Sequence, residues 1–301
     1  MKPAERGERM ILENELLRVE IAQMGAELMH IIDRRNGEEL LWQGNPTYWK
    51  RRAPVLFPNV GRTWRDEFRI NGRRYRTSQH GFARDRSFAC EEADRSRAVF
   101  LLREDAESLR RYPFPFELRI AYALEGGELA VRWSVRNPGT EEMCFTIGGH
   151  PAFYFGDADA RKEDFQLFFP GKTMLEALRL DPASGTALPG NVERYALPEG
   201  RLDLTEALFE KNAMILDGAQ VEEVWLCRRD GRPRVGMRSP GFPNFGIWSV
   251  AGAPFVCLEP WAGRCDDAGF EGELRDKPNV NRVAPGAAFE KQYSILLPAG
   301  D

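Results

Sequence analysis

Residues 116–136 read FELRIAYALEGGELAVRWSVR, and this segment decides the fold. Apolar side chains occupy alternate positions on both sides of the central Glu-Gly-Gly-Glu at 125–128, from Phe116 to Leu124 and from Leu129 to Val135. Charged residues such as Glu117, Arg119 and Arg132 lie between them. When apolar residues recur at every second position, one face of the strand packs into a core and the other face points outward. The segment therefore predicts a long amphipathic β-hairpin.

The same alternation, punctuated by turn residues, recurs along the chain. Asn71-Gly72 separates Phe68–Ile70 from Arg73–Thr77, and an Asn-Gly pair supplies the two positive φ angles of a tight hairpin turn. A third hairpin is expected around Arg229-Asp230-Gly231. Further strands are predicted at Leu16–Ile21, Leu28–Ile32, Val99–Arg103, Phe245–Val250, Phe255–Leu258 and Tyr293–Leu297.

Helical patterns are scarce, with short candidates at Asn45–Lys50, Glu104–Arg110 and Thr205–Phe209. The Pro- and Gly-rich stretch 181–200 reads as a long surface loop. Many short strands without alternating helices predict an all-β fold, a large antiparallel β-sandwich. A chain of 301 residues fits a single domain, 1–301.

Composition narrows the choice of partner. The 42 basic and 46 acidic residues give a net charge of −4, which favours a small molecule over nucleic acid or an anionic membrane. Residues 1–10 lack an apolar signal segment and no long apolar run follows, so we expect a cytoplasmic protein. Five scattered cysteines without a C-x-x-C pair are typical of reduced thiols, not of disulfides or a zinc site.

Few residues can carry chemistry. His30 lies within an apolar strand pattern and is expected to be structural, whereas His80 and His150 lie beside glycines in bent segments and are either functional or satisfied structural residues. Glu259 ends the apolar run Phe255–Leu258, where a carboxylate is costly unless it is paired or used. An arginine partner is the alternative to a catalytic role.

Arginines and tryptophans leave similar alternatives open. The segment 51–86 is rich in arginines that either solvate strand faces or grip sugar hydroxyls or a phosphate, namely Arg51, Arg52, Arg62, Arg65, Arg73, Arg74, Arg76, Arg84 and Arg86. Trp42, Trp64, Trp248 and Trp261 are either core residues or sugar-stacking platforms. No nucleotide-binding, hydrolase-nucleophile or metal motif is present, which favours acid/base chemistry without a metal or cofactor.

Four motifs in order resemble the aldose 1-epimerase (galactose mutarotase) family: Phe57–Arg62, His80–Arg84, Gly149–Phe153 and Leu258–Trp261. The closing residues, Pro285-Gly286 to Ile295, are also similar to that family's final strands. The resemblance implies a galactose mutarotase-like β-supersandwich with an open active-site cleft. It also implies an enzyme that interconverts sugar anomers without a cofactor.

The resemblance assigns roles residue by residue. It implies that Glu259 is the general base, that His150 is the general acid and that His80 helps to hold the ring oxygen. It implies sugar contacts from Arg62, Trp261 and Asn212. It also implies a sugar contact from Arg84, because the His-Gly-Phe-Ala-Arg form is similar to hexose-6-phosphate epimerase-like and uncharacterised branches. Asn212 stands where many relatives carry an aspartate, which leaves the preferred sugar open.

The competing interpretations are a non-catalytic carbohydrate-binding domain and a glycoside hydrolase. A carbohydrate-binding domain has no need of two histidines and a glutamate together. A glycoside hydrolase needs two carboxylates about 5–9.5 Å apart, and we find only one well-placed carboxylate. We therefore expect His80, His150 and Glu259 to converge on one cleft, away from His30, with Glu259 ionised and His150 protonated. The arginines predict a negatively charged hexose derivative; the oligomeric state stays open.

Overall fold

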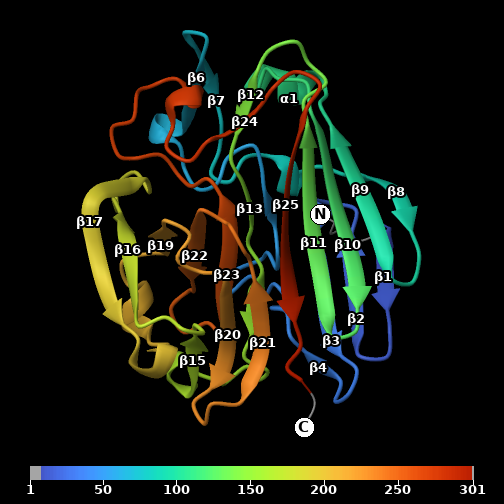
Figure 1. Cartoon of the computed structure of the whole chain (residues 1–301), viewed down its shortest axis with the longest axis vertical. Helices are drawn as coiled ribbons and strands as arrows, with labels where there is room; N and C mark the ends of the chain where they lie inside the picture. The colour runs from blue at the N-terminus through green and yellow to red at the C-terminus, as the bar shows by residue number, and fades with distance from the viewer. Residues whose placement is uncertain (1–7, 300–301) are drawn as a thin grey trace.

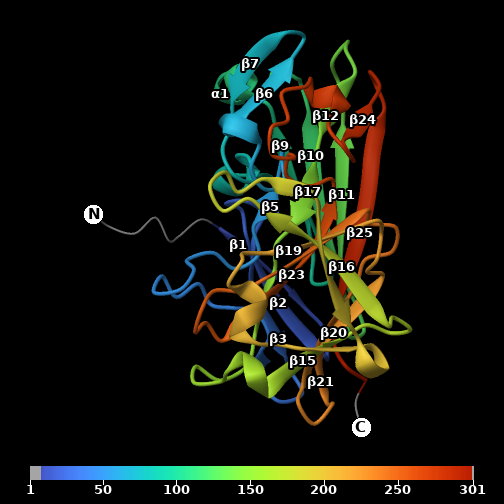
Figure 2. The ribbon, with the colours of Figure 1, turned by 90° about the vertical axis from the view of Figure 1, so that its left-hand side faces the viewer.

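The computed structural model describes residues 8–299, which form antiparallel sheets (Figures 1 and 2). The largest sheet has nine strands in the order β18 (Arg201–Asp203), β15 (Phe165–Phe168), β20 (Glu223–Arg228), β21 (Pro233–Arg238), β25 (Ala288–Leu296), β11 (Glu128–Arg136), β10 (Glu117–Glu125), β9 (Arg97–Arg103) and β8 (Ala89–Ala93). Its long strands β9, β10, β11 and β25 run side by side on the right of Figure 1.

The second sheet has eight strands and carries the chemistry described below. Its order is β17 (Ala187–Ala196), β16 (Met174–Leu180), β19 (Met214–Asp217), β22 (Asn244–Trp248), β23 (Phe255–Ala262), β13 (Ile147–Gly149) and β5 (Val55–Leu56), with β14 (Ala152–Tyr154) also paired to β23. In Figure 1 its β16–β17 edge lies on the left.

Smaller sheets complete the structure. A four-stranded sheet contains β1 (Arg9–Glu13), β2 (Leu17–Ala22), β3 (Leu28–Asp33) and β4 (Glu38–Glu39). Two-stranded sheets pair β6 (Glu67–Ile70) with β7 (Arg73–Arg76) and β12 (Met143–Phe145) with β24 (Asn281–Val283). The expectation of an all-β antiparallel fold is confirmed.

The hairpin at 116–136 forms as predicted, with Glu125 opposite Glu128 across the Gly-Gly turn. Its apolar face joins side chains from all three large sheets in one buried cluster, including Ile21 of β2, Trp133 of β11, Ile247 of β22 and Leu258 of β23. The other two hairpins form as well, and Asn71 and Gly72 have φ angles of 50° and 76°. The core therefore lies between sheets.

Helices are short, as the sequence indicates. The α-helix α1 spans Ala106–Arg111, and 3-10 turns lie at Trp64–Asp66 (η1), Ala83–Asp85 (η2), Lys162–Asp164 (η3), Pro198–Gly200 (η4), Glu206–Phe209 (η5) and Leu274–Asp276 (η6). The helix expected at Asn45–Lys50 is wrong, because this segment is a turn. No helix within residues 8–299 is long and apolar enough to cross a membrane.

The prediction of a loop at 181–200 is also wrong. This stretch contains strand β17, which pairs with β16 at the edge of the eight-stranded sheet. Pro189 and Gly190 suggested a loop, but they lie where the register shifts between Leu178 and Leu180. An edge strand tolerates proline because its outward N–H groups need no partner in the sheet.

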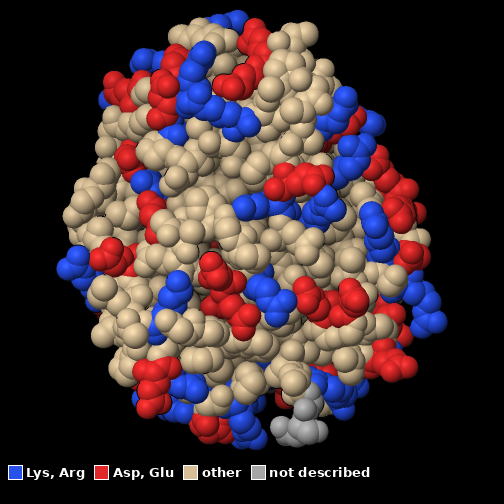
Figure 3. All heavy atoms as spheres, in the orientation of Figure 1, with Lys and Arg blue, Asp and Glu red and all other residues tan. Residues whose placement is uncertain are grey.

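Charges of both signs are interspersed on the face drawn in Figure 3. Arginines and lysines alternate with aspartates and glutamates over short distances, and many form ion pairs, for example Arg119 with Glu91 and Arg132 with Glu290. This face therefore carries no extended field of one sign.

A close backbone contact fixes the His80 loop against the 57–62 segment. Gly81 has a φ of +67°, and a Cβ added there would lie 2.2 Å from the carbonyl oxygen of Phe57. The same oxygen accepts hydrogen bonds from the N–H groups of Phe82 and Ala83. Only glycine fits this position, so Gly81 determines where the neighbouring imidazole lies.

We predict that Gly81→Ala destabilises the protein by at least about 3 kcal/mol, because a steric clash adds to the left-handed conformation, which costs about 1–2 kcal/mol. Gly72→Ala is the matched control, since Gly72 has a φ of +76° with no atom within 4 Å of the added Cβ. Urea unfolding measures both losses. Equal losses would show that the contact with Phe57 does not constrain the loop.

Candidate active site

One cleft gathers the side chains that the sequence singles out. It encloses about 870 Å³, and its lining includes all seven predicted site residues: Arg62, His80, Arg84, His150, Asn212, Glu259 and Trp261. His30 lies outside it and pairs with Glu39 at 2.7 Å. The structure thus brings the two candidate histidines and the glutamate together and separates the third histidine, as expected.

Glu259 faces the cleft because of strand alternation. Along β23, Val256 and Leu258 belong to the core between the sheets, so Cys257, Glu259 and Trp261 point to the opposite face. His150 follows the end of β13, which pairs with β23. Its Nε2 lies 3.3 Å from Oε2 of Glu259. The expected alternative of an arginine partner for Glu259 is absent among the described ion pairs.

Trp261 forms part of the cleft floor and is 4 % exposed. Glycines on both flanking strands make room for it, because a Cβ at Gly148 or Gly246 would lie 2.5 or 2.3 Å from the Trp261 ring. Its buried indole N–H makes no hydrogen bond of normal geometry. Against the larger effect of burial, which raises the pKa of Glu259, this N–H lowers that pKa, so the indole supports the carboxylate form.

His80 is held in one tautomer by the backbone. The N–H of Gly61 donates to its Nδ1 at 3.1 Å, so a neutral His80 carries its proton on Nε2 and can donate it. The His80 and His150 rings meet edge to face with centroids 5.4 Å apart. The two imidazoles therefore share one end of the cleft.

Burial sets the protonation of these groups. It raises the pKa of Glu259 well above its ordinary value and lowers the pKa of His150 to about 3. It also lowers the pKa of His80 well below its ordinary value, with repulsion from His150 and Arg84 acting in the same direction. The expectation of an ionised Glu259 beside a protonated His150 is therefore wrong for the free protein, because desolvation favours the neutral form of both groups.

Arginines give one side of the cleft a positive potential. Burial, and then repulsion from Arg51, lowers the pKa of Arg84 to about 10. Its Nη2 donates to the carbonyl of Gln79 at 2.7 Å, and its buried Nε lies 3.8 Å from Oδ2 of Asp85 without a hydrogen bond. Arg62 is half-exposed and pairs with Asp66 at 3.1 Å. Arg84 is thus the guanidinium best placed to accept an anion.

Asn212 lies exposed at the rim, where its φ is 74° and its Oδ1 accepts the N–H of Ala213 at 2.8 Å. One lone pair of its side-chain oxygen is therefore engaged in the turn, and the other lone pair and the NH₂ group can contact a sugar. Glu210 and Lys211 line the same rim and were not predicted, since nothing in their local pattern distinguishes them from other charged loop residues.

Trp49 is the main aromatic residue that the sequence analysis missed. It lines the cleft and stacks on His150, with ring centroids 4.8 Å apart and planes inclined by 27°. Trp42 packs in a buried cluster, whereas Trp248 and Trp261 line the cleft. No periodic signal could have found Trp49, because it lies in the turn mistaken for a helix.

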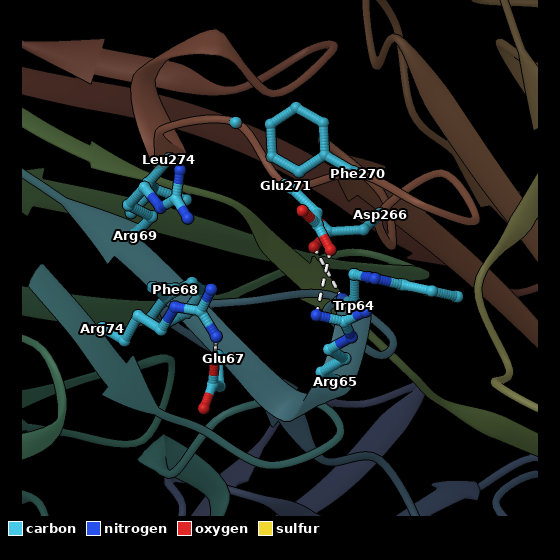
Figure 4. A pocket seen from close by; sticks show the side chains of 11 residues that line it. Trp64, Arg65, Glu67, Phe68, Arg69, Arg74, Asp266, Phe270, Glu271 and Leu274 are labelled. Carbon is cyan, nitrogen blue, oxygen red and sulfur yellow. Dashed lines mark hydrogen bonds and ion pairs between the residues drawn. The ribbon is translucent and has the colours of Figure 1, made fainter. Parts of the chain in front are cut away.

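A second, smaller pocket is lined by residues from the segments 64–74 and 266–274 (Figure 4). Trp64 donates its backbone N–H to Asp266 at 2.8 Å, and Arg65 pairs with Glu271 at 2.9 Å. Arg74 also pairs with Glu67 at 3.3 Å. The charges of this pocket are therefore largely neutralised by one another.

The chain is similar to known proteins over nearly its whole length. The family model described as aldose 1-epimerase matches residues 8–272. The LacX proteins of Lactococcus lactis, one chromosomal and one plasmid-encoded, are 33% identical over 294 residues, which cover 95% of this chain and 98% of theirs.

Two solved structures are similar over nearly the whole chain. A galactose mutarotase related enzyme from Lactobacillus acidophilus is 33% identical with a TM-score of 0.91, covering 97% of this chain and 98% of that one. A galactose mutarotase-like protein from Lactobacillus casei is 29% identical with a TM-score of 0.87, covering 97% and 100%. The predicted galactose mutarotase-like fold is thereby confirmed. Fold, sequence and family model together show that the chain belongs to the aldose 1-epimerase family.

Proposed function

We propose that this protein interconverts the α and β anomers of a hexose or hexose derivative. The observation that carries the proposal is the 3.3 Å contact between Nε2 of His150 and Oε2 of Glu259 within the cleft. Anomer exchange needs one proton removed from O1 and one delivered to O5, and both oxygens are bonded to C1. Two neighbouring proton carriers suit two neighbouring oxygens.

In the free protein, the pair of Glu259 and His150 holds one proton. This proton lies on the carboxyl, so both groups are neutral. A bound sugar changes this balance, because its O1 hydroxyl adds a second donor to Glu259, beside the Trp261 N–H that already lowers the pKa of this carboxyl. The shared proton then resides on His150. The pair reaches the ionised form that catalysis needs without taking up or releasing a proton.

Ring opening follows from that state. Glu259 removes the O1 proton, His150 protonates O5, the C1–O5 bond breaks and O1 becomes an aldehyde oxygen. His80 donates from Nε2 to the ring oxygen and keeps it near His150. After rotation about C1–C2, the O5 hydroxyl attacks the other face, O5 returns its proton to His150 and O1 regains a proton from Glu259.

The arginines support an anionic substrate. Arg51, Arg62 and Arg84 all repel a proton on His80, so their combined field in the cleft favours negative charge. A phosphate would compete with Asp85, whose Oδ2 lies 3.8 Å from the buried Nε of Arg84, for a charge-assisted hydrogen bond with this guanidinium. A hexose phosphate is therefore our favoured substrate class.

Glu259→Gln should lower kcat about 10²-fold or more, because the amide cannot take the O1 proton, while sugar affinity changes by only a few fold. Polarimetry above the spontaneous rate and calorimetry measure the two effects. Glu39→Gln is the control, since Glu39 forms the other described histidine–glutamate contact, with His30. Full activity in Glu259→Gln would end this mechanism, and sugar binding without catalysis in the wild type would favour a carbohydrate-binding domain.

Arg84→Gln should raise KM for hexose 6-phosphates about tenfold or more and leave neutral hexoses nearly unchanged, because a hydrogen bond to a charged group is worth about 1.5–3 kcal/mol. Arg86→Gln is the control, since Arg86 turns away to Asp105 and Glu107. Coupled assays with both sugar classes test this. The proposal of an anionic substrate would be refuted if the wild type preferred neutral hexoses and Arg84→Gln left KM for hexose 6-phosphates unchanged.

With a neutral hexose as substrate, the acid limb of the kcat/KM profile should lie well below pH 6.5, the ordinary pKa of imidazole. The active pair holds one proton. Because burial lowers the pKa of His150 to about 3, a second proton binds only in strong acid, and because burial raises the pKa of Glu259, the shared proton is retained well above pH 4.5. An acid limb of kcat/KM centred near pH 6.5 would instead indicate a solvated His150.

A further inference from the structure

His150 is enclosed by aromatic rings on three sides. Trp49 covers one face at 4.8 Å and 27°, while Trp248 and His80 meet it edge to face, with centroids 5.6 and 5.4 Å away. The imidazole is 6 % exposed as a result. Trp49 is the one stacked partner and covers the face that the edge contacts leave open.

Trp49 is itself held firmly. Its N–H donates to the carbonyl of Asn45 at 3.0 Å, and its carbonyl accepts the indole N–H of Trp42 at 2.8 Å. Its ring packs edge to face on Trp248, with centroids 5.6 Å apart, and against Phe255. The turn at 45–50 and the outer face of β22 and β23 therefore fix the indole in place.

We propose that Trp49 is a positioning residue for His150, which fixes the plane of the imidazole and excludes water from it, so that the proton of the His150–Glu259 pair stays on the carboxyl until a sugar binds. This inference deepens the proposed function and rests on it for its kinetic consequence.

Two opposing effects of the indole must be weighed. A cation–π attraction would favour the imidazolium and raise the pKa of His150 by only about one. Full burial can lower the pKa of a histidine by about three to five. Exclusion of water therefore outweighs the attraction, and removing the indole should raise the pKa of His150.

Other groups facing His150 do not change when Trp49 is replaced. Five charged or titratable side chains lie near the imidazole or act on it: Glu259 and Cys257 of β23, His80 of the His80 loop, Arg84 of η2, and Arg51. Arg51 and Arg84 repel the imidazolium in the wild type and in the variant alike. A change in titration can therefore be attributed to the indole.

The experiment is an imidazole NMR titration, which suits a chain with only three histidines. His150→Asn assigns the His150 signal, and wild type, Trp49→Ala, Trp49→Phe and Trp64→Ala are titrated between about pH 4 and 8, spanning ordinary imidazole titration. In wild type we expect His150 to stay neutral. In Trp49→Ala its pKa should rise by about two or more, from about 3 into the titrated range, and the acid limb of kcat/KM should move upward equally.

The controls separate positioning from general damage. Trp49→Phe keeps an aromatic face over the imidazole and should retain most of the wild-type titration of His150. Trp64→Ala removes an indole from the second pocket and should leave the titration of His150 unchanged. Loss of activity in Trp49→Ala with an unshifted His150 titration would overturn the proposal. A shifted titration in a protein without mutarotase activity would uphold the role of Trp49 and refute the proposed function.

Discussion

The organising constraint is the burial of a carboxyl beside an imidazole. Glu259 and His150 are 1 % and 6 % exposed, yet neither is neutralised by a cation within the described ion pairs. Each group alone would be costly to ionise there. Burial favours the form in which the carboxyl carries the proton and the imidazole is neutral, with the two groups 3.3 Å apart.

The fold supplies this arrangement through strands and close backbone contacts. Alternation along β23 places Leu258 in the core and Glu259 in the cleft, so the same strand stabilises the sandwich and carries the carboxyl. Gly148 admits the Trp261 ring, and Gly81 lets the His80 loop contact Phe57. The stability of the sheets and the geometry of the cleft therefore depend on the same segments.

The sequence predicted the parts of this structure that depend on local pattern. Alternation and Asn-Gly chemistry located the hairpins at 116–136 and 71–72, and the family resemblance selected the residues that line the cleft. Strand β17 was missed because its Pro189 and Gly190 are tolerated only at a sheet edge, which is a property of the assembled sheet. The protonation of the pair and the stacking of Trp49 depend on burial by distant segments, so no local pattern reveals them.

Exchange NMR at C1 of ¹³C-labelled sugars tests the central claim most directly, because it observes α and β anomers interconverting at equilibrium. Glucose, galactose and glucose 6-phosphate should be compared with and without the protein. We expect exchange between the two C1 signals at a rate that grows in proportion to protein concentration and is highest for glucose 6-phosphate. Binding of these sugars with an exchange rate equal to the spontaneous one would contradict it.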